Sequence, residues 1–156
     1  MQKQNSRWLL LSVAIIILDQ ATKFVITQHF YYATAHYVTP FFNILHLHNY
    51  GAAFSFMDYP GGEQRWLLTL ISLVVSVMFI IWLLRLTNHH HWFAAGLACI
   101  IGGALSNLCG RLMLGYVVDF LDLHMAQYHW PAFNVADAAI CVGTIILVVS
   151  VVKHKR

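Results

Sequence analysis

The sequence carries very little charge for its length. Only 10% of its 156 residues are Asp, Glu, Lys or Arg, whereas 60% are hydrophobic. Soluble domains of this size carry about a quarter charged residues, and apolar surface on this scale is solvated only by a lipid bilayer. No basic stripe lies on a polar segment, which excludes a nucleic-acid partner. The length indicates a single membrane domain over residues 1–156.

The sequence also lacks residues at the spacing of a metal site. Its three cysteines all lie in apolar runs, where small buried hydrophobic residues are expected. They are Cys99, Cys109 and Cys141. Asp122, His124 and His129 lie near one another in sequence but match no metal motif. We therefore predict a protein with no metal and no cofactor.

Four apolar runs are long enough to cross a bilayer, which takes a helix of about 20 residues. They cover residues 8–28, 66–84, 92–118 and 132–152. The first run could instead be a secretory signal, but no small-x-small cleavage site follows Leu18. The sequence therefore predicts an all-α polytopic membrane protein with four transmembrane helices.

Basic residues orient these four spans. The clusters are Lys3 with Arg7, Arg85 beside the run His89-His90-His91, and Lys153 with Lys155 and Arg156. All three clusters fall on one side of the membrane if there are four spans, and the positive-inside rule makes that side the cytoplasm. Both termini are then cytoplasmic, while residues 29–65 and 119–131 face outward.

The outer segment 29–65 has structure of its own. Leu45-His46-Leu47-His48 alternates with a period of two, which is typical of a half-buried strand. Asn49-Tyr50-Gly51 then supplies a turn or bulge signal. We expect a small outward-facing β-sheet and a short interfacial helix on the outer leaflet.

Three acidic residues are predicted to lie at one height near the outer leaflet. Asp19 and Asp137 lie within spans, and Asp119 ends the third span. A carboxylate at membrane depth costs roughly 2.5–3.5 kcal/mol, so it pairs, faces the bundle interior or has a function. Two carboxyl groups close together share a proton and can activate water for peptide hydrolysis. Asp119 and Asp137 are the best such pair, with ion pairing or helix capping as the alternative.

Further polar residues share helix faces with one another, because residues three or four apart lie on one face. The pairs are Asn134 with Asp137, Asn107 with Arg111, and Asp19 with Lys23. The last of these pairs would neutralise itself and allow the first span to insert. Asp122, by contrast, is expected to be a solvated charge beside a loop.

Four blocks of sequence together resemble lipoprotein signal peptidase, also called signal peptidase II. The first two blocks are Asp19-Gln20-Ala21-Thr22-Lys23 and Asn49-Tyr50-Gly51-Ala52-Ala53-Phe54-Ser55. The third is Gly102-Gly103-Ala104-Leu105-Ser106-Asn107 with Arg111. The fourth joins Val117-Val118-Asp119-Phe120 to Phe133-Asn134-Val135-Ala136-Asp137. Their order and spacing against four spans cover nearly the whole chain.

The resemblance implies a four-helix aspartyl peptidase of the bacterial inner membrane. This family uses two aspartates and a water, without a metal, to cleave diacylglyceryl-modified prolipoproteins just before the lipidated cysteine. The catalytic aspartates match Asp119 and Asp137. The supporting or substrate-binding residues match Asp19, Lys23, Asn49, Asn107, Arg111 and Asn134. The implied partners are lipid-modified prolipoproteins, membrane lipids and inhibitors of the globomycin type.

Two positions depart from the family pattern of Gly-Asn-x-x-Asp-Arg. Ser106 replaces the glycine, and Gly110 replaces the aspartate before Arg111. We expect the absence of this carboxylate to lower the stability of the protein and to leave it active, since the proposed chemistry needs only Asp119 and Asp137. Two alternatives stay open: an inactive relative that binds lipoprotein precursors, and a small transporter, since intramembrane carboxylates also occur in transporters.

Overall fold

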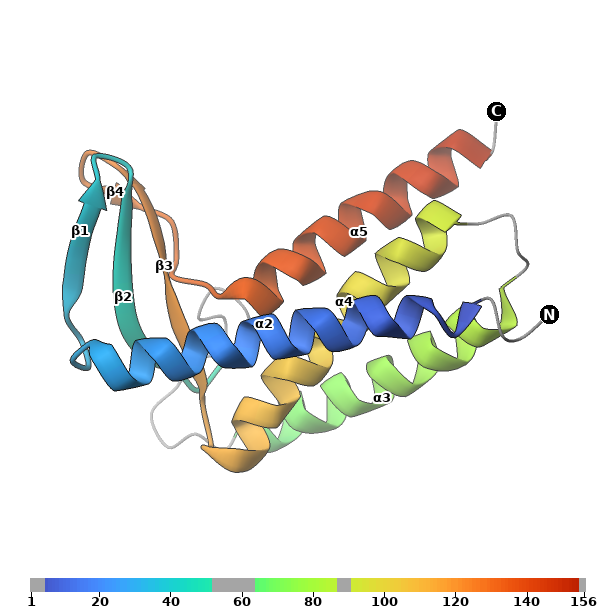
Figure 1. The fold of residues 1–156 in the computed structure, drawn as a ribbon, viewed down its shortest axis with the longest axis horizontal. Coiled ribbons are helices and arrows are strands. Elements are labelled where there is room, and N and C mark those ends of the chain that lie inside the picture. The colour runs from blue at the N-terminus through green and yellow to red at the C-terminus, as the bar shows by residue number, and fades with distance from the viewer. Residues whose placement is uncertain (1–4, 52–63, 87–90, 155–156) are drawn as a thin grey trace.

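The fold combines a helical bundle with a small sheet at one end (Figure 1). The structure, a computed structural model, describes residues 5–51, 64–86 and 91–154. Its four long helices are α2 (Trp8–His29), α3 (Gln64–Arg85), α4 (His91–Met113) and α5 (Val135–His154). All four are long and apolar enough to cross a membrane. This confirms the predicted polytopic membrane protein with four spans.

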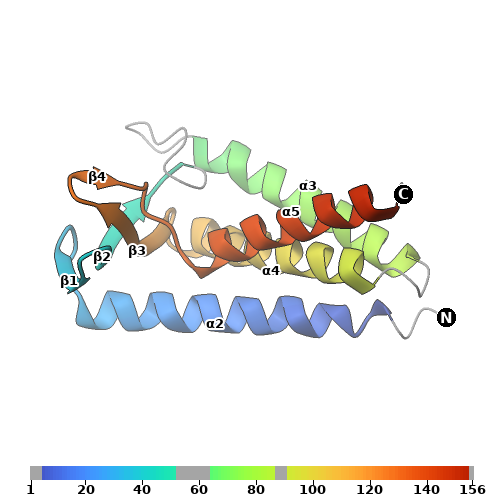
Figure 2. The same ribbon diagram turned by 90° about the horizontal axis from the view of Figure 1, so that it is seen from above.

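Helix α4 is the centre of the bundle and lies between α2 and α3 (Figure 2). Small residues allow its neighbours to approach closely, which is how helices associate without a hydrophobic driving force. A Cβ atom on Gly96 would lie 2.9 Å from the carbonyl oxygen of Gly143 on α5. On another face of α4, a Cβ atom on Gly102 would lie 2.9 Å from the carbonyl oxygen of Ser12 on α2. Helix α4 is therefore in near-backbone contact with two neighbours.

The sheet has four antiparallel strands in the order β1-β2-β3-β4. They are β1 (Ala35–Thr39), β2 (Phe42–Asn49), β3 (Val117–Met125) and β4 (Tyr128–His129). Strand β2 contains the alternating segment, so the predicted strand is confirmed. The interfacial helix predicted for the same outer segment is not found at 29–51, and residues 52–63 lie outside the described part of the chain.

The third predicted span, 92–118, is too long at its far end. Helix α4 stops at Met113, and Gly115 follows in the left-handed conformation with φ 86°. Glycine reaches this conformation without steric cost and commonly ends helices. The apolar residues from Val117 onward then form β3, so Asp119 lies on a strand and not at a helix end. Hydrophobicity alone does not separate a buried strand from the end of a helix.

Replacing Gly103 with alanine is expected to destabilise the bundle. A Cβ atom there would overlap the carbonyl oxygen of Ala136, in the first turn of α5, and crowd Ile140. Overpacking of this kind costs about 1–3 kcal/mol, which exceeds the helix-propensity gain of roughly 1 kcal/mol. Thermal unfolding of Gly103→Ala in detergent should therefore show a lower midpoint. Cys141→Ala on the exposed face of α5 is the control, and an unchanged midpoint for Gly103→Ala would contradict this packing.

Candidate active site

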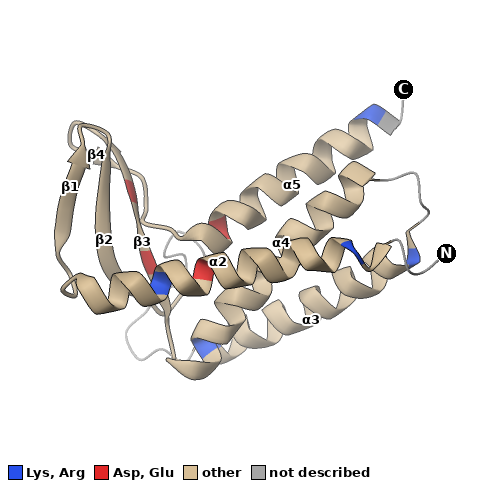
Figure 3. Cartoon of the chain, viewed as in Figure 1, with Lys and Arg blue, Asp and Glu red and all other residues tan. Residues whose placement is uncertain are grey.

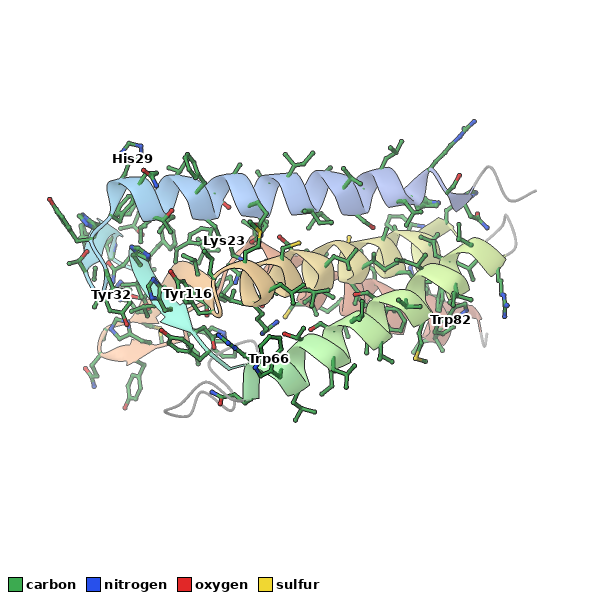
Figure 4. All side chains as sticks on the ribbon, turned by 90° about the horizontal axis from the view of Figure 1, so that it is seen from below. Lys23, His29, Tyr32, Trp66, Trp82 and Tyr116 are labelled. Atoms are coloured by element: carbon green, nitrogen blue, oxygen red, sulfur yellow. The ribbon has the colours of Figure 1, made fainter. Side chains whose placement is uncertain are left out.

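Eight polar residues meet where the sheet joins the helical bundle. They are Asp19, Lys23, Asn49, Asn107, Arg111, Asp119, Asn134 and Asp137, all buried. Figure 3 shows acidic residues gathered at this junction, and Figure 4 shows Lys23 on the side of α2 that faces α4. All eight residues suggested by sequence therefore lie in one region, contributed by α2, α4, α5, β2 and β3 and by Asn134, the residue just before α5.

Asp137 is held by the start of its own helix. The side chain Oδ1 of Asn134 accepts a hydrogen bond of 3.0 Å from the backbone N–H of Asp137. In return, the backbone N–H of Asn134 donates to Asp137 Oδ2 at 3.2 Å. This reciprocal pair is a capping box, which satisfies backbone donors that the first turn leaves free. It explains why α5 begins at Val135, three residues later than predicted, and it holds the Asp137 carboxyl group against the backbone of Asn134 at the start of the helix.

Asn134 also connects Asp137 to Asp119. Its side-chain Nδ2 donates to Asp119 Oδ1 at 2.7 Å. The other oxygen of Asp119, Oδ2, accepts from Asn49 Nδ2 at 2.8 Å. One asparagine thus touches both candidate catalytic carboxyl groups, and each oxygen of Asp119 has its own amide donor.

A second chain of contacts reaches Asp137 from α2. Lys23 Nζ pairs with Asp19 Oδ2 at 2.6 Å, which confirms the predicted ion pair. The same ammonium group donates to Asn107 Oδ1 at 2.9 Å, and Asn107 Nδ2 donates to Asp137 Oδ1 at 2.8 Å. Because Lys23 has donors only, it requires the carbonyl oxygen of Asn107. The amide group of Asn107 is therefore directed at Asp137.

The surroundings of Asp119 raise the pKa of its carboxyl group above the usual value for aspartate. Burial, and then the negative charge of Asp137, raise the pKa of Asp119 to about 7. Hydrogen bonds from Asn49 and Asn134 and the charge of Lys23 act in the opposite direction. Asp119 is therefore a carboxyl group that exchanges its proton near neutral pH, as acid–base catalysis requires.

Arg111 organises the turn that follows β2. Its Nη2 donates to the carbonyl oxygen of Gly51 at 2.8 Å, and the backbone N–H of Gly51 donates to Asn49 Oδ1 at 2.8 Å. These contacts confirm the predicted turn at Asn49-Tyr50-Gly51. The bond from the Gly51 N–H also occupies the side-chain Oδ1 of Asn49 and leaves the Nδ2 of the same amide group for Asp119.

The prediction that Asp122 is a solvated charge is wrong. Asp122 is only 3% exposed. Its Oδ2 accepts from Asn43 Nδ2 at 2.9 Å, and its two oxygens lie 2.9 and 3.0 Å from His129 Nδ1. The reason is register, because β2 places Asn43 directly opposite Asp122 on β3. Asp122 therefore ties neighbouring strands together, three residues beyond Asp119.

Two features at the departures from the family pattern were not predicted from sequence. Ser106 donates a hydrogen bond to Asp19 and so belongs to the polar region. The only sequence signal for this role is a hydroxyl group within an apolar span. Gly110 packs against the start of β3, and a Cβ atom there would lie 3.1 Å from the carbonyl oxygen of Tyr116. This contact opposes the gain in stability that we expected from an aspartate at position 110.

Comparison with known proteins identifies the family. A family model for signal peptidase (SPase) II matches residues 11–153. The chain belongs to the signal peptidase II family. The lipoprotein signal peptidase of Ralstonia nicotianae is 47% identical over 149 residues, which cover 96% of this chain and 86% of that protein. The lipoprotein signal peptidase of Acinetobacter baylyi is 48% identical over 145 residues, covering 93% and 81%.

Solved structures agree with this assignment to signal peptidase II. A bacterial membrane enzyme determined by the in meso method at 2.3 Å resolution superposes with a TM-score of 0.86 at 25% identity. That match covers 96% of this chain and 90% of the other. A second such structure, at 1.9 Å resolution, gives a TM-score of 0.82 at 26% identity and covers 95% and 94%. As a signal peptidase II, the chain is a protease embedded in a membrane, and neither the transporter nor the inactive relative is favoured.

Asn134→Ala is expected to lower both stability and activity. The substitution removes the cap of α5, which costs about 1 kcal/mol, and removes the amide that touches Asp119 and Asp137. We expect a lower unfolding midpoint and a loss of turnover of at least about tenfold. Asn43→Ala is the matched control, because Asn43 also donates to a carboxyl group on β3, that of Asp122. Equal turnover in the two variants would contradict a special role for Asn134.

Proposed function

We propose that the chain removes signal peptides from prolipoproteins by aspartyl hydrolysis at Asp119 and Asp137. The observation that carries this proposal is that one residue, Asn134, donates to both buried carboxyl groups, from its side-chain Nδ2 to Asp119 and from its backbone N–H to Asp137. The substrate class follows from the relatives, which are lipoprotein signal peptidases. By family resemblance, the substrates carry a diacylglyceryl group and are cut just before the lipidated cysteine.

In the proposed reaction the two aspartates have different protonation states. Asp137 lies in the first turn of α5, where the helix dipole stabilises a negative charge. Asp119 lies on a strand without such a dipole, and its pKa is raised to about 7. We therefore assign the ionised form to Asp137 and the protonated form to Asp119. These forms give the pair one base and one acid.

A water between the two carboxyl groups is the nucleophile. Asp137 takes one proton from this water while the water oxygen bonds to the scissile carbonyl carbon. Asp119 donates a hydrogen bond to the developing oxyanion. When the tetrahedral intermediate collapses, the C–N bond breaks and the leaving amine receives a proton from the dyad. The amide groups of Asn49, Asn107 and Asn134 hold the carboxyl oxygens in place throughout. This chemistry requires neither a metal nor a cofactor.

Arg111 is a candidate contact for the substrate. Its Nη2 is used by Gly51, but its buried Nε has no hydrogen-bond partner among the residues that the structure describes. A buried donor without a partner is costly. A carbonyl oxygen of the substrate backbone or of its lipid group would satisfy it.

The proposed location is the bacterial inner membrane, with both termini in the cytoplasm. The basic residues Arg7, Arg85 and Lys153 lie at the end of the bundle that carries both termini, while the acidic residues lie toward the sheet (Figure 3). The positive-inside rule makes the first end cytoplasmic. The active site is then near the outer leaflet, where a lipid-anchored substrate enters laterally. Inhibitors of the globomycin type are expected to bind there.

Replacing either dyad member is expected to abolish cleavage. Asparagine preserves the size of aspartate but cannot take up and release a proton in the same way. Asp119→Asn and Asp137→Asn should each lower turnover of a lipidated prolipoprotein by at least about a hundredfold. Mass spectrometry of the cleavage products measures the turnover. Thermal unfolding of each variant in detergent shows whether it is folded.

The control for these variants is Asp122→Asn. Asp122 is a buried carboxyl group on the same strand, but its partners are Asn43 and His129. We expect this variant to lose stability while keeping most of its activity at low temperature. A folded Asp119→Asn or Asp137→Asn protein with near-normal turnover would refute the assignment of the dyad.

The pH dependence of turnover tests which aspartate is the acid. If protonated Asp119 is required, turnover falls as the pH rises through about 7, because deprotonation removes the acid. If Asp119 were the base, turnover would instead rise over the same interval. A profile of kcat from pH 5 to pH 9 distinguishes the two, since kcat reports groups in the enzyme–substrate complex.

A further inference from the structure

The carboxylate of Asp19 connects three helices. It is fully buried and accepts three hydrogen bonds or ion-pair contacts. Lys23 Nζ on α2 lies 2.6 Å from Oδ2, and Ser106 Oγ on α4 donates to the same oxygen at 2.7 Å. The backbone N–H of Ala136 on α5 donates to Oδ1 at 2.9 Å. The Asp19 side chain, which comes from α2, therefore contacts the start of α5 at Ala136, the residue before Asp137.

The hydroxyl group of Ser106 has a defined direction. Gln20 Nε2 lies 2.9 Å from Ser106 Oγ and 3.2 Å from the carbonyl oxygen of Ser106. An amide nitrogen is a donor only, so the hydroxyl oxygen accepts from Gln20. Its single hydrogen is therefore free to donate to Asp19. The residue that departs from the family's glycine thus provides a directed donor to a buried charge.

Two routes lead from Asp19 to Asp137. The first passes through the backbone of Ala136, which Asp19 holds in the first turn of α5. The second passes through Lys23, which directs the amide group of Asn107 at Asp137 Oδ1. If the Asp19 carboxylate changes its position or its hydrogen-bond donors, the first turn of α5 and the Asn107 amide group are both affected. These are the two groups that hold Asp137.

We propose that Ser106 is a positioning residue for the dyad, because its hydroxyl group holds the Asp19 carboxylate between Lys23 and the first turn of α5. This role rests on the proposed function of Asp119 and Asp137 and adds a residue to it. Ser106 does not touch the reacting atoms. Its effect reaches them through Asp19, Lys23 and Asn107.

Two substitutions at position 106 separate positioning from packing. Ser106→Ala puts a methyl group where the donor was and leaves the buried carboxylate short of one hydrogen bond, which is costly. Ser106→Gly opens a polar space in which a water can replace the hydroxyl group. Positioning therefore predicts that the glycine variant is more active than the alanine variant. Packing and helix propensity predict the reverse, because alanine is the better helix former.

Ser12→Ala is the matched control. Ser12 Oγ donates to the carbonyl oxygen of Ala98 at 2.7 Å, so it is also a buried serine that joins α2 to α4. Within the part of the chain that the structure describes, the Ser12 hydroxyl group makes no hydrogen bond to Asp19 or Lys23. Loss of this bond should lower the unfolding midpoint without changing catalysis.

The experiment measures kcat, KM and the unfolding midpoint of the full chain in detergent, with a lipidated prolipoprotein as substrate. We expect Ser106→Ala to lower kcat by about tenfold with KM little changed, because misplaced catalytic groups affect the chemical step. Ser106→Gly should fall between this variant and the parent, and Ser12→Ala should keep the parent kcat. Gln20→Leu removes the donor that directs the Ser106 hydroxyl group and should also lower kcat. This variant replaces Ser106→Ala in the comparison if Ser106→Ala does not fold.

Three results would overturn the role of Ser106: an unchanged kcat in Ser106→Ala or in Gln20→Leu, an alanine variant more active than the glycine variant, or an equal loss of kcat in Ser12→Ala. Asp119→Asn in the same assay separates this inference from the proposed function. An inactive Asp119→Asn with a normal Ser106→Ala overturns the role of Ser106 alone. An active Asp119→Asn overturns the dyad together with it.

Discussion

The burial of three carboxyl groups at the junction of helices and sheet is the constraint on which the rest of the structure depends. Asp19, Asp119 and Asp137 are each at most 2% exposed, and unpaired buried charges are very costly. The protein meets this cost with amide donors, one lysine and the backbone N–H groups at the start of α5. The carboxyl groups and their donors together come from five different elements, α2, α4, α5, β2 and β3, so the site exists only when these elements are assembled.

Close packing of α4 makes this assembly possible. Gly103 allows the first turn of α5 to approach, and Gly102 allows α2 to approach. Asn107 and Arg111 lie one and two turns further along the same helix, and so they enter the polar region at the correct height. In a bilayer, where helix association depends on packing and on interhelical hydrogen bonds, the glycines and the polar network support each other.

The sheet contributes both structural support and one of the two candidate catalytic residues. Strand β3 carries Asp119, and β2 carries Asn49 opposite Val117, two residues before it. Asp122 ties the far part of β3 to Asn43 on β2 and to His129 on β4. Backbone hydrogen bonds between Leu121 and Phe133 tie β3 to the segment that leads into α5. Asp119 is therefore placed by a paired strand and Asp137 by a capped helix. If these two residues are the dyad that we propose, such placement is the electrostatic preorganisation that catalysis requires.

The sequence by itself determined the four spans, the strand at Leu45–His48, the Asp19–Lys23 pair and the identity of the two candidate aspartates, because each depends on local periodicity, short spacing or a recognisable motif. Only the tertiary structure decided that Asp119 lies on a strand, that Asp122 is buried against Asn43 and His129, and that Ser106 donates to Asp19. These features depend on strand register and on the approach of helices nearly ninety residues apart in sequence, as in the Ser106–Asp19 contact with a separation of 87. Such long-range pairings leave no periodic trace in the chain, since they are set by which surfaces fit together once the elements have formed.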